Sequence, residues 1–179
     1  MKIEARIVHF FNRIGKNTVL NKITLILNYI PFLVALVFII IIFVYSYDPA
    51  NLKVFLASLI IVICFHFLIS ELIFKKVVVS FIGIRKRPYL SYSSIKGIGK
   101  KFSDSSFPSS HMSAITGILF IVSYFYPLTI IFSIIFLLFM AFSRIHNGMH
   151  YPSDVLAGFI LGLFYGVMGL SLVNLIYVF

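Results

Sequence analysis

Long apolar runs alternate with short polar segments along this sequence. The runs cover about residues 23–45, 54–79, 111–126, 128–143 and 154–178. A helix that crosses the hydrocarbon core of a bilayer needs about 20 apolar residues, so the runs have roughly the length of membrane spans. A tight turn near Tyr126-Pro127 joins the third and fourth runs, and Pro31 is expected to kink the first, as membrane helices tolerate. The pattern predicts an all-α, polytopic membrane helix bundle with five spans.

Residues 1–22 show a different pattern. Apolar residues recur at helical spacing, namely Ile3, Ile7, Phe10, Phe11 and Ile14. The cations Lys2, Arg6, Arg13 and Lys16 lie mostly between them. This alternation predicts an amphipathic helix that lies on the membrane surface. The segment lacks the compact apolar core and small-residue cleavage site of a signal peptide.

The number of spans decides which polar segments share a membrane face. With five spans, residues 80–110 and 144–153 lie on the same face as the N-terminal helix. The opposite face receives only residues 46–53, the 126–127 turn and the C-terminus. In the last span, Gly158, Gly162 and Gly166 recur at intervals of four and predict close contact with a neighbouring helix.

Composition supports the membrane assignment. The 179 residues are 61% hydrophobic and 11% charged. In soluble domains about half of the residues are apolar and about a quarter are charged. The length indicates a single domain over residues 1–179. For a membrane chain, a net charge of +10 favours anionic lipid or a phosphorylated substrate as partner over nucleic acid. The single cysteine, Cys64, excludes an internal disulfide.

Three polar clusters lie on the shared face: Arg85–Pro88, Phe107–His111 and Ser143–Asp154. Guanidinium groups match phosphate oxygens with paired hydrogen bonds, which strengthen as water is excluded. The second cluster opens a helix, where free backbone N–H groups favour an anion. Ser109 and Ser110 add hydroxyl donors there, although Ser109 is equally suited to an N-cap.

His111 and His150 are candidates for nucleophilic and acid–base chemistry on phosphorus. Asp154, four residues after His150, can fix its tautomer, and Arg144 can neutralise charge on the transferring group. Two other interpretations stay open. An acid at residue 154 is favoured by the helix dipole alone. His146, His150 and Asp154 also recur every four residues, as in a metal site, although Pro152 disrupts that helical stripe.

Further ionisable residues lie within or near the second span and in the long loop. His66 and Glu71 are intramembrane residues, and Glu71 is expected to pair with Lys75 one turn later. In the loop, Lys96, Lys100 and Lys101 either attract an anionic head group or anchor the loop to acidic lipid.

The three clusters resemble the type-2 phosphatidic acid phosphatase family of membrane lipid phosphatases. Its third motif, Ser-Arg, five residues, His, three residues, Asp, is matched by Ser143-Arg144, His150 and Asp154. The second, Pro-Ser-Gly-His, is matched by Pro108, Ser109 and His111, with Ser110 replacing glycine. Arg87-Pro88 matches the end of the first motif, whose lysine position falls on Ser80. Residues 75–154 thus carry the resemblance, and Lys76, one helical turn before Ser80, can reach the site instead, as can Arg85 or Lys86.

The resemblance implies roles for particular residues. His150 would be the nucleophile that forms a phosphohistidine, Asp154 would orient it, and His111 would protonate the leaving alcohol and later activate water. The phosphate would be held by Arg87, Arg144, Ser109, Ser110 and Lys76. The family needs no metal or other cofactor, so none is expected here.

We expect a lipid phosphatase, and the basic loop favours head groups with several negative charges. Among the substrates of bacterial relatives, lipid A 1-phosphate and undecaprenyl pyrophosphate are therefore preferred over phosphatidylglycerol phosphate and phosphatidic acid. A lipid phosphotransferase and a non-enzymatic lipid transporter or scaffold are the alternatives. All of the 15 Lys and Arg residues except Lys53 lie on the motif face, which predicts that it is cytoplasmic. The resemblance instead implies the outer, periplasmic face of a bacterial inner membrane, and we follow the resemblance.

Overall fold

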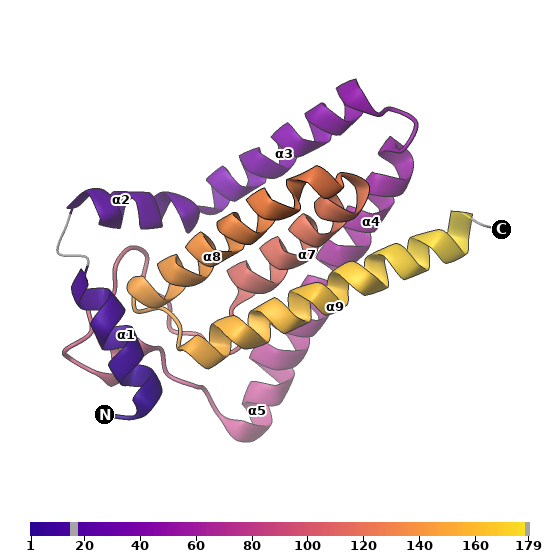
Figure 1. Ribbon diagram of the computed structural model, residues 1–179. Helices are drawn as coiled ribbons and strands as arrows, with labels where there is room; N and C mark the ends of the chain where they lie inside the picture. Colours follow the sequence, from indigo (N-terminus) through magenta and orange to yellow (C-terminus); the bar gives the residue numbers. More distant parts are fainter. Residues whose placement is uncertain (15–17, 178–179) are drawn as a thin grey trace.

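A computed structural model describes residues 1–14 and 18–177 of the protein. The described residues are helical, with no strand among them (Figure 1). The helices are α1 (Ile3–Ile14), α2 (Thr18–Leu27), α3 (Ile30–Tyr47), α4 (Leu52–Phe65), η1 (His66–Val78), α5 (Val79–Ile82), α6 (Pro88–Ser91), α7 (Ser110–Phe125), η2 (Pro127–Thr129), α8 (Ile130–His146) and α9 (Pro152–Tyr177). The predicted all-α class is confirmed.

Four continuous helical segments of the described chain, some of which join several labelled helices, are long and apolar enough to cross a bilayer: Ile30–Tyr47, Leu52–Ile82, Pro127–His146 and Pro152–Ile176. The shorter apolar helix α7 lies among them and is the most enclosed, with Ile115, Ile118 and Ile121 buried (Figure 1). The continuous helix from Leu52 to Ile82 comprises α4, η1 and α5, and η1 is a π-helix, a rare winding that is wider than the α-helix. These helices correspond to the five predicted spans and form a polytopic bundle.

The prediction for the first span was wrong at its start. Residues 23–27 belong to α2, which packs on α8, and the span begins only at α3. Pro31 does not kink a continuous helix, because it lies in the first turn of α3, where its missing N–H leaves no helical bond unmade. Polar groups of α2 instead find partners at the end of α8, where the Thr24 hydroxyl donates to Asn147 Oδ1 at 2.9 Å.

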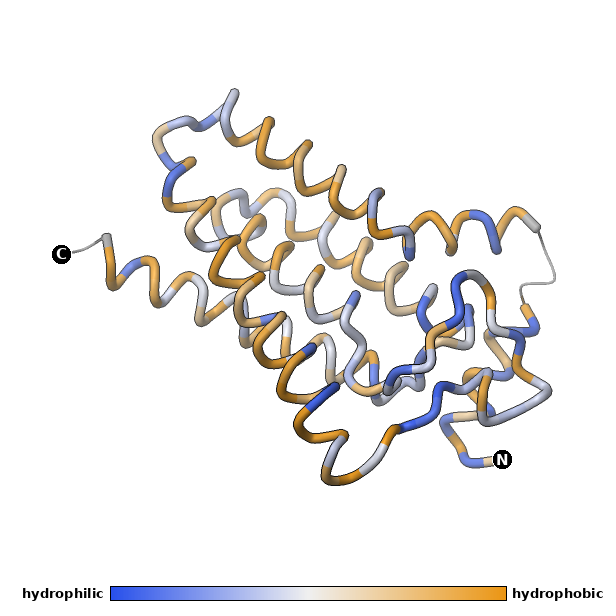
Figure 2. Tube along the Cα trace, turned by 180° about the vertical axis from the view of Figure 1, so that it is seen from behind, coloured by the Kyte–Doolittle hydropathy of each residue, from blue (hydrophilic) through white to orange (hydrophobic). Residues whose placement is uncertain are grey.

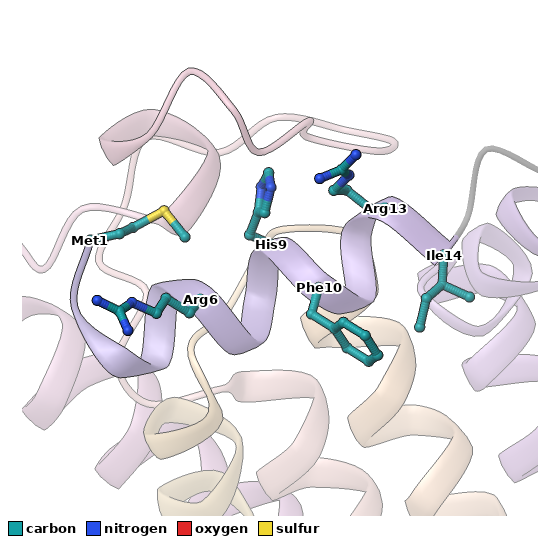
Figure 3. A pocket seen from close by; sticks show the side chains of 6 residues that line it. All are labelled: Met1, Arg6, His9, Phe10, Arg13 and Ile14. Atoms are coloured by element: carbon teal, nitrogen blue, oxygen red, sulfur yellow. The ribbon is translucent and has the colours of Figure 1, made fainter.

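The predicted amphipathic helix is present as α1, and Lys16 lies outside the described residues. Its inner face packs on the bundle, with Ala5 and Val8 buried against Ile95 and Tyr151. Figure 3 shows the outer part, where His9 and Arg13 extend to one side, Phe10 and Ile14 extend to the other, and Arg6 extends along the helix toward Met1. The α1 helix is therefore a docked part of the fold as well as a surface helix.

The polar segments gather at one end of the bundle, as the span count predicted. The helices α1 and α2, the loop from α5 to α7 and the turn from α8 to α9 lie together there (Figure 1), and Figure 2 shows that most hydrophilic residues share this end. The glycine stripe packs α9 tightly on α7. A Cβ at Gly158 would lie 2.6 Å from the Ser109 carbonyl oxygen, and one at Gly162 would lie 2.5 Å from that of Ser113. The predicted close helix contact is confirmed.

Candidate active site

The turn after α8 brings Arg144 and His150 together. The Arg144 carbonyl accepts hydrogen bonds from the backbone N–H groups of Met149, at 3.2 Å, and His150, at 3.3 Å. The turn needs glycine at residue 148, because φ there is +68° and a Cβ would lie 2.9 Å from the Lys96 carbonyl oxygen. Local backbone geometry thus places a histidine ring beside an arginine that precedes it by six residues.

The His150 ring is buried and has different partners on its two nitrogens. Nδ1 lies 2.7 Å from the Ser106 carbonyl oxygen, which can only accept, so Nδ1 carries the proton. Nε2 lies 3.0 Å from Arg144 Nη2 and 3.3 Å from Arg87 Nη1. Burial, then the charges of Arg144 and Arg87, hold the pKa of His150 well below its ordinary value. The ring is therefore neutral, with a lone pair on Nε2 between two guanidinium groups.

Asp154 does not make the direct hydrogen bond to His150 that we expected. Its Oδ2 lies 3.9 Å from His150 Nδ1, and the Ser106 carbonyl takes the hydrogen bond instead. Asp154 lies in the first turn of α9, where its Oδ2 accepts from the Tyr151 N–H at 2.8 Å, as in a capping box. Its other oxygen accepts from Arg85 Nη1 at 2.6 Å. The carboxylate is thus close to the histidine but is held by its own helix and by Arg85.

Glu4 completes this arrangement from α1. Arg85 Nη2 donates to Glu4 Oε2 at 2.8 Å, and the Ser153 N–H donates to Glu4 Oε1 at 3.0 Å. Burial alone would raise the pKa of Glu4, but the hydrogen bonds from Ser153 and the charge and hydrogen bond of Arg85 lower it. Arg85 is therefore engaged by two carboxylates, which leaves it poorly placed to replace the first-motif lysine. Nothing in the sequence connects residue 4 with residues 85 and 153.

Lys75, rather than Lys76, points toward the site. Lys75 Nζ lies 3.3 Å from Glu71 Oε1, as predicted, and also 3.2 Å from Asp104 Oδ2. Asp104 in turn accepts from Arg87 Nη2 at 2.7 Å. Lys76 is exposed, and no ion pair joins it to another described residue. Successive residues of a helix point about 100° apart, so a one-residue difference decides which lysine faces the bundle.

Asp104 was not singled out by its sequence because it is a lone acid in a polar loop. Burial alone would raise its pKa, but the hydrogen bond and charge of Arg87, with the charge of Lys75, lower it. Arg87 also donates to the Met149 carbonyl at 3.3 Å and is 2% exposed. Asp104 therefore fixes one edge of the Arg87 guanidinium, while the other edge faces His150.

Asn28 is a second residue that its sequence gave no reason to select, because it lies inside an apolar run. It occupies the break between α2 and α3. His111 Nε2 lies 3.3 Å from the Asn28 carbonyl oxygen, and Arg144 Nη1 donates to the Asn28 side-chain oxygen. His111 and Arg144 line a cavity of about 220 Å³. The break therefore places one backbone and one side-chain oxygen against two candidate site residues.

The first turn of α7 adds hydroxyl groups without hydrogen-bond partners. Ser109 has N-cap geometry, yet its side chain makes no capping hydrogen bond. Among the described residues, Ser109 Oγ, Ser110 Oγ, Arg87 Nε and Arg144 Nε are buried and unpaired. Buried polar atoms are normally hydrogen-bonded. A tetrahedral oxyanion at the start of α7 would supply acceptors for the two serine hydroxyls, so capping alone does not account for the serines.

His146 is not part of this group. Its Nδ1 lies 3.0 Å from the Phe11 carbonyl oxygen and its Nε2 lies 3.0 Å from Asn21 Oδ1, so it is directed at α1 and α2. The stripe of His146, His150 and Asp154 is therefore not assembled into one site. In the described part of the chain, no three His, Cys, Asp or Glu residues are grouped to hold a metal ion. The geometry instead suits phosphate binding beside one neutral histidine, with a second histidine at the cavity wall.

Comparisons with known proteins identify the family and the fold. The family model described as the PAP2 superfamily matches residues 51–176. A crystal structure of a transmembrane PAP2-type phosphatidylglycerolphosphate phosphatase from Bacillus subtilis superposes with a TM-score of 0.70 at 22% sequence identity. That match covers 94% of this chain and 83% of the Bacillus chain. A search of the curated proteins gave no match.

Proposed function

The chain belongs to the PAP2 superfamily, and we propose that it hydrolyses a phosphate from a lipid head group through a phosphohistidine on His150. The observation that carries the proposal is the position of His150 Nε2, which lies 3.0 Å and 3.3 Å from the Arg144 and Arg87 guanidinium groups while Nδ1 lies 2.7 Å from the Ser106 carbonyl oxygen. A nucleophile beside two fixed cations is what attack on an anionic phosphoryl group requires.

In the first step, Nε2 of His150 bonds to phosphorus and the bond from phosphorus to the leaving oxygen breaks. His111, which enters this step as the imidazolium beside the bound anionic phosphate, gives a proton to that oxygen and becomes neutral. The Ser106 carbonyl holds the Nδ1 proton of the resulting phosphohistidine. In the second step, His111 takes a proton from water as the water oxygen bonds to phosphorus and Nε2 leaves. The two steps together release phosphate and return both histidines to their starting states.

The remaining residues act on charge and position. Arg87, Arg144, Ser109 and Ser110 would bind the phosphoryl oxygens, because each has a buried donor without a partner among the described residues. Asp154, 3.9 Å from His150 Nδ1, would stabilise the imidazolium character that develops on the ring. The role in phosphate binding that we first assigned to Lys76 is assigned instead to Lys75. Lys75 acts indirectly, because it forms an ion pair with Asp104, which in turn pairs with Arg87. No metal is needed in this scheme.

The proposed substrate is a lipid that carries a terminal phosphate monoester or pyrophosphate. Lipid A 1-phosphate and undecaprenyl pyrophosphate fit the basic loop, and phosphatidylglycerol phosphate, named for the Bacillus protein, and phosphatidic acid are the alternatives. The cavity beside His111 supports a lipid, since the exposed apolar residues Leu25, Tyr29 and Ile30 lie on its lining. A phosphotransferase would use the same first step but pass the phosphoryl group to a second lipid.

Phosphate release by the purified protein tests the proposal. We expect release from at least one member of a panel of these four lipid phosphates, unchanged by a chelator. We expect loss of release in His150→Ala but not in His9→Ala, a control on α1. Normal release by His150→Ala would overturn the mechanism, and loss on chelation would favour metal chemistry. Transfer of radiolabel to a second lipid would identify a phosphotransferase.

We also propose that the multi-pass chain lies in a bacterial inner membrane with its site on the periplasmic face. A cysteine introduced at Lys101, in a Cys64→Ser background, should react with a membrane-impermeant maleimide in intact cells. A cysteine at Asn51, between α3 and α4 at the other end of the bundle, should react only after the membrane is opened. The reverse pattern would place the site in the cytoplasm, as the charge distribution alone predicts.

A further inference from the structure

We infer that the cavity beside His111 is a subsite for a leaving group that itself carries a negative charge, and that Lys100 recognises that charge. The inference rests on the proposed function and narrows its substrates. It selects lipids whose departing part retains a phosphate, such as a polyprenyl pyrophosphate or phosphatidylglycerol phosphate, over lipids with a neutral leaving group.

The position of the cavity assigns it to the leaving group. His111 and Arg144 line it, whereas His150 does not. In a phosphoryl transfer the attacking and leaving atoms lie roughly in line on opposite sides of phosphorus. With His150 as nucleophile and His111 as acid, the departing oxygen lies on the His111 side. The rest of the leaving group then extends into the cavity.

The cavity has two chemically different walls. The break between α2 and α3 contributes Leu25, Tyr29 and Ile30, all exposed, so this wall suits the first part of a lipid chain. The loop before α7 contributes Gly99, Lys100 and Phe102. Arg144, the other lysine or arginine on the lining, is engaged by Asn28 and His150. Lys100 therefore supplies the cation that is free for a second anion.

Contacts on both sides hold Lys100 at the cavity. The Ile98 N–H donates to the Asn147 carbonyl at 3.1 Å, and the Phe102 N–H donates to the Tyr89 hydroxyl at 2.9 Å. A Cβ at Gly99 would lie 2.5 Å from Leu25 Cδ2, and φ there is +92°, so glycine lets this loop press against α2. The ammonium group lies 5.6 Å from the Phe102 ring centroid.

These contacts leave the Lys100 ammonium group able to bind an anion. In the described part of the chain, no carboxylate forms an ion pair with Lys100. An anionic leaving group would gain a charge-assisted hydrogen bond, whereas a neutral diacylglycerol would gain none. Because the lysine is exposed, we expect a moderate selectivity of about fivefold.

The test compares Lys100→Gln with Lys101→Gln, a neighbouring lysine that is not on the cavity lining. For each protein, kcat/KM is measured in detergent micelles with a polyprenyl pyrophosphate, phosphatidylglycerol phosphate and phosphatidic acid. We expect Lys100→Gln to lower kcat/KM about fivefold for at least one of the first two substrates and less than twofold for phosphatidic acid. Lys101→Gln should leave all three values within twofold of wild type. The first two substrates distinguish a pyrophosphate from a phosphodiester as the anion recognised.

Three results would overturn the inference while the proposed function stands. They are an equal loss for all three substrates, no loss for any, and a wild-type preference for phosphatidic acid. Release from lipid A 1-phosphate alone would also overturn the inference, whereas no release from any of the four proposed lipid phosphates would contradict the proposed function itself. Surface substitutions change stability little, so we expect both variants to melt within about 2 °C of wild type. Such melting temperatures would exclude misfolding as the cause of a lower kcat/KM.

Discussion

His146 and His150 are both buried and only four residues apart, yet they have opposite surroundings. Both ring nitrogens of His146 lie 3.0 Å from oxygen atoms of α1 and the neighbouring α2, so this ring ties α8 to the N-terminal segment. His150 has one oxygen acceptor at Nδ1, and its Nε2 faces two guanidinium groups. A ring with oxygen partners on both sides is structural. A ring with a lone pair among cations is suited to attack a bound anion.

The largest expected effect is the contrast between alanine substitutions of these two histidines. His150→Ala removes the proposed nucleophile and should lower kcat by about 10³-fold or more. His146→Ala removes the buried ring contacts with the Phe11 carbonyl and the Asn21 side chain and should reduce the free energy of unfolding by about 1–3 kcal/mol. Its phosphate release per folded molecule should stay within a few-fold of wild type.

Phosphate release and thermal unfolding, measured on the same preparations, would check this contrast. The comparison fails if His146→Ala loses as much activity per folded molecule as His150→Ala does.

Arg144→Lys tests whether the guanidinium geometry at His150 matters, or only its charge. Arg144 contacts both the Asn28 side chain and His150 Nε2 through its planar guanidinium group. A lysine ammonium group cannot make both contacts in the same plane. We expect kcat to fall about 10²-fold, as for loss of a donor to a developing oxyanion. Steady-state kinetics at saturating substrate would measure it. A kcat within threefold of wild type would mean that charge alone suffices.

Lys75→Ala and Lys76→Ala form a matched pair on the second span. Lys75 forms an ion pair with Asp104, and Asp104 positions Arg87. Lys76 is exposed. Loss of this partly buried ion pair is worth about 1 kcal/mol, so Lys75→Ala should lower kcat/KM about fivefold. Lys76→Ala should change it less than twofold. The reverse order in the same kinetic assay would restore Lys76 as the lysine that serves the site.

Glu4→Gln should have the smallest effect and a defined pH dependence. The pKa of Glu4 is lowered in the fold, so its ionised form stabilises the protein above the ordinary pKa of 4.5, and this contribution is lost as the pH falls through the lowered value. Because Glu4 is partly exposed, Glu4→Gln should cost less than about 1 kcal/mol near pH 7. Unfolding at pH 7 and pH 4 would measure it. A larger difference at pH 4 would contradict this account.

The fold was predictable to the extent that hydropathy controls it. The apolar runs predicted the spans, and Gly158, Gly162 and Gly166 predicted the tight contact of α9. The start of the first span was mispredicted because hydropathy does not separate a membrane-crossing segment from one packed on α8. Thr24 in α2 and Asn28 just after it are tolerated because α8 and its turn offer hydrogen-bond partners, and those partners lie more than 100 residues away.

The candidate site was predictable where residue type and short spacing carry the chemistry. His111, His150, Arg87, Arg144 and the two serines could be selected from their sequence, and their catalytic roles stay predictions. Asp104, Asn28 and Glu4 could not be selected. Each is an ordinary polar residue whose significance depends on what it contacts: Arg87, Arg144 or Arg85.

The sequence alone therefore determined the helical membrane class, the face that carries the polar residues and the family, because apolar length and motif spacing act locally along the chain. Only the tertiary structure decided which lysine faces the site, which oxygen holds His150 Nδ1 and which carboxylates engage Arg85. Those outcomes depend on side-chain directions and on contacts between distant segments. A change of one residue in helical phase, or of one hydrogen-bond acceptor, alters them without altering the pattern of the sequence.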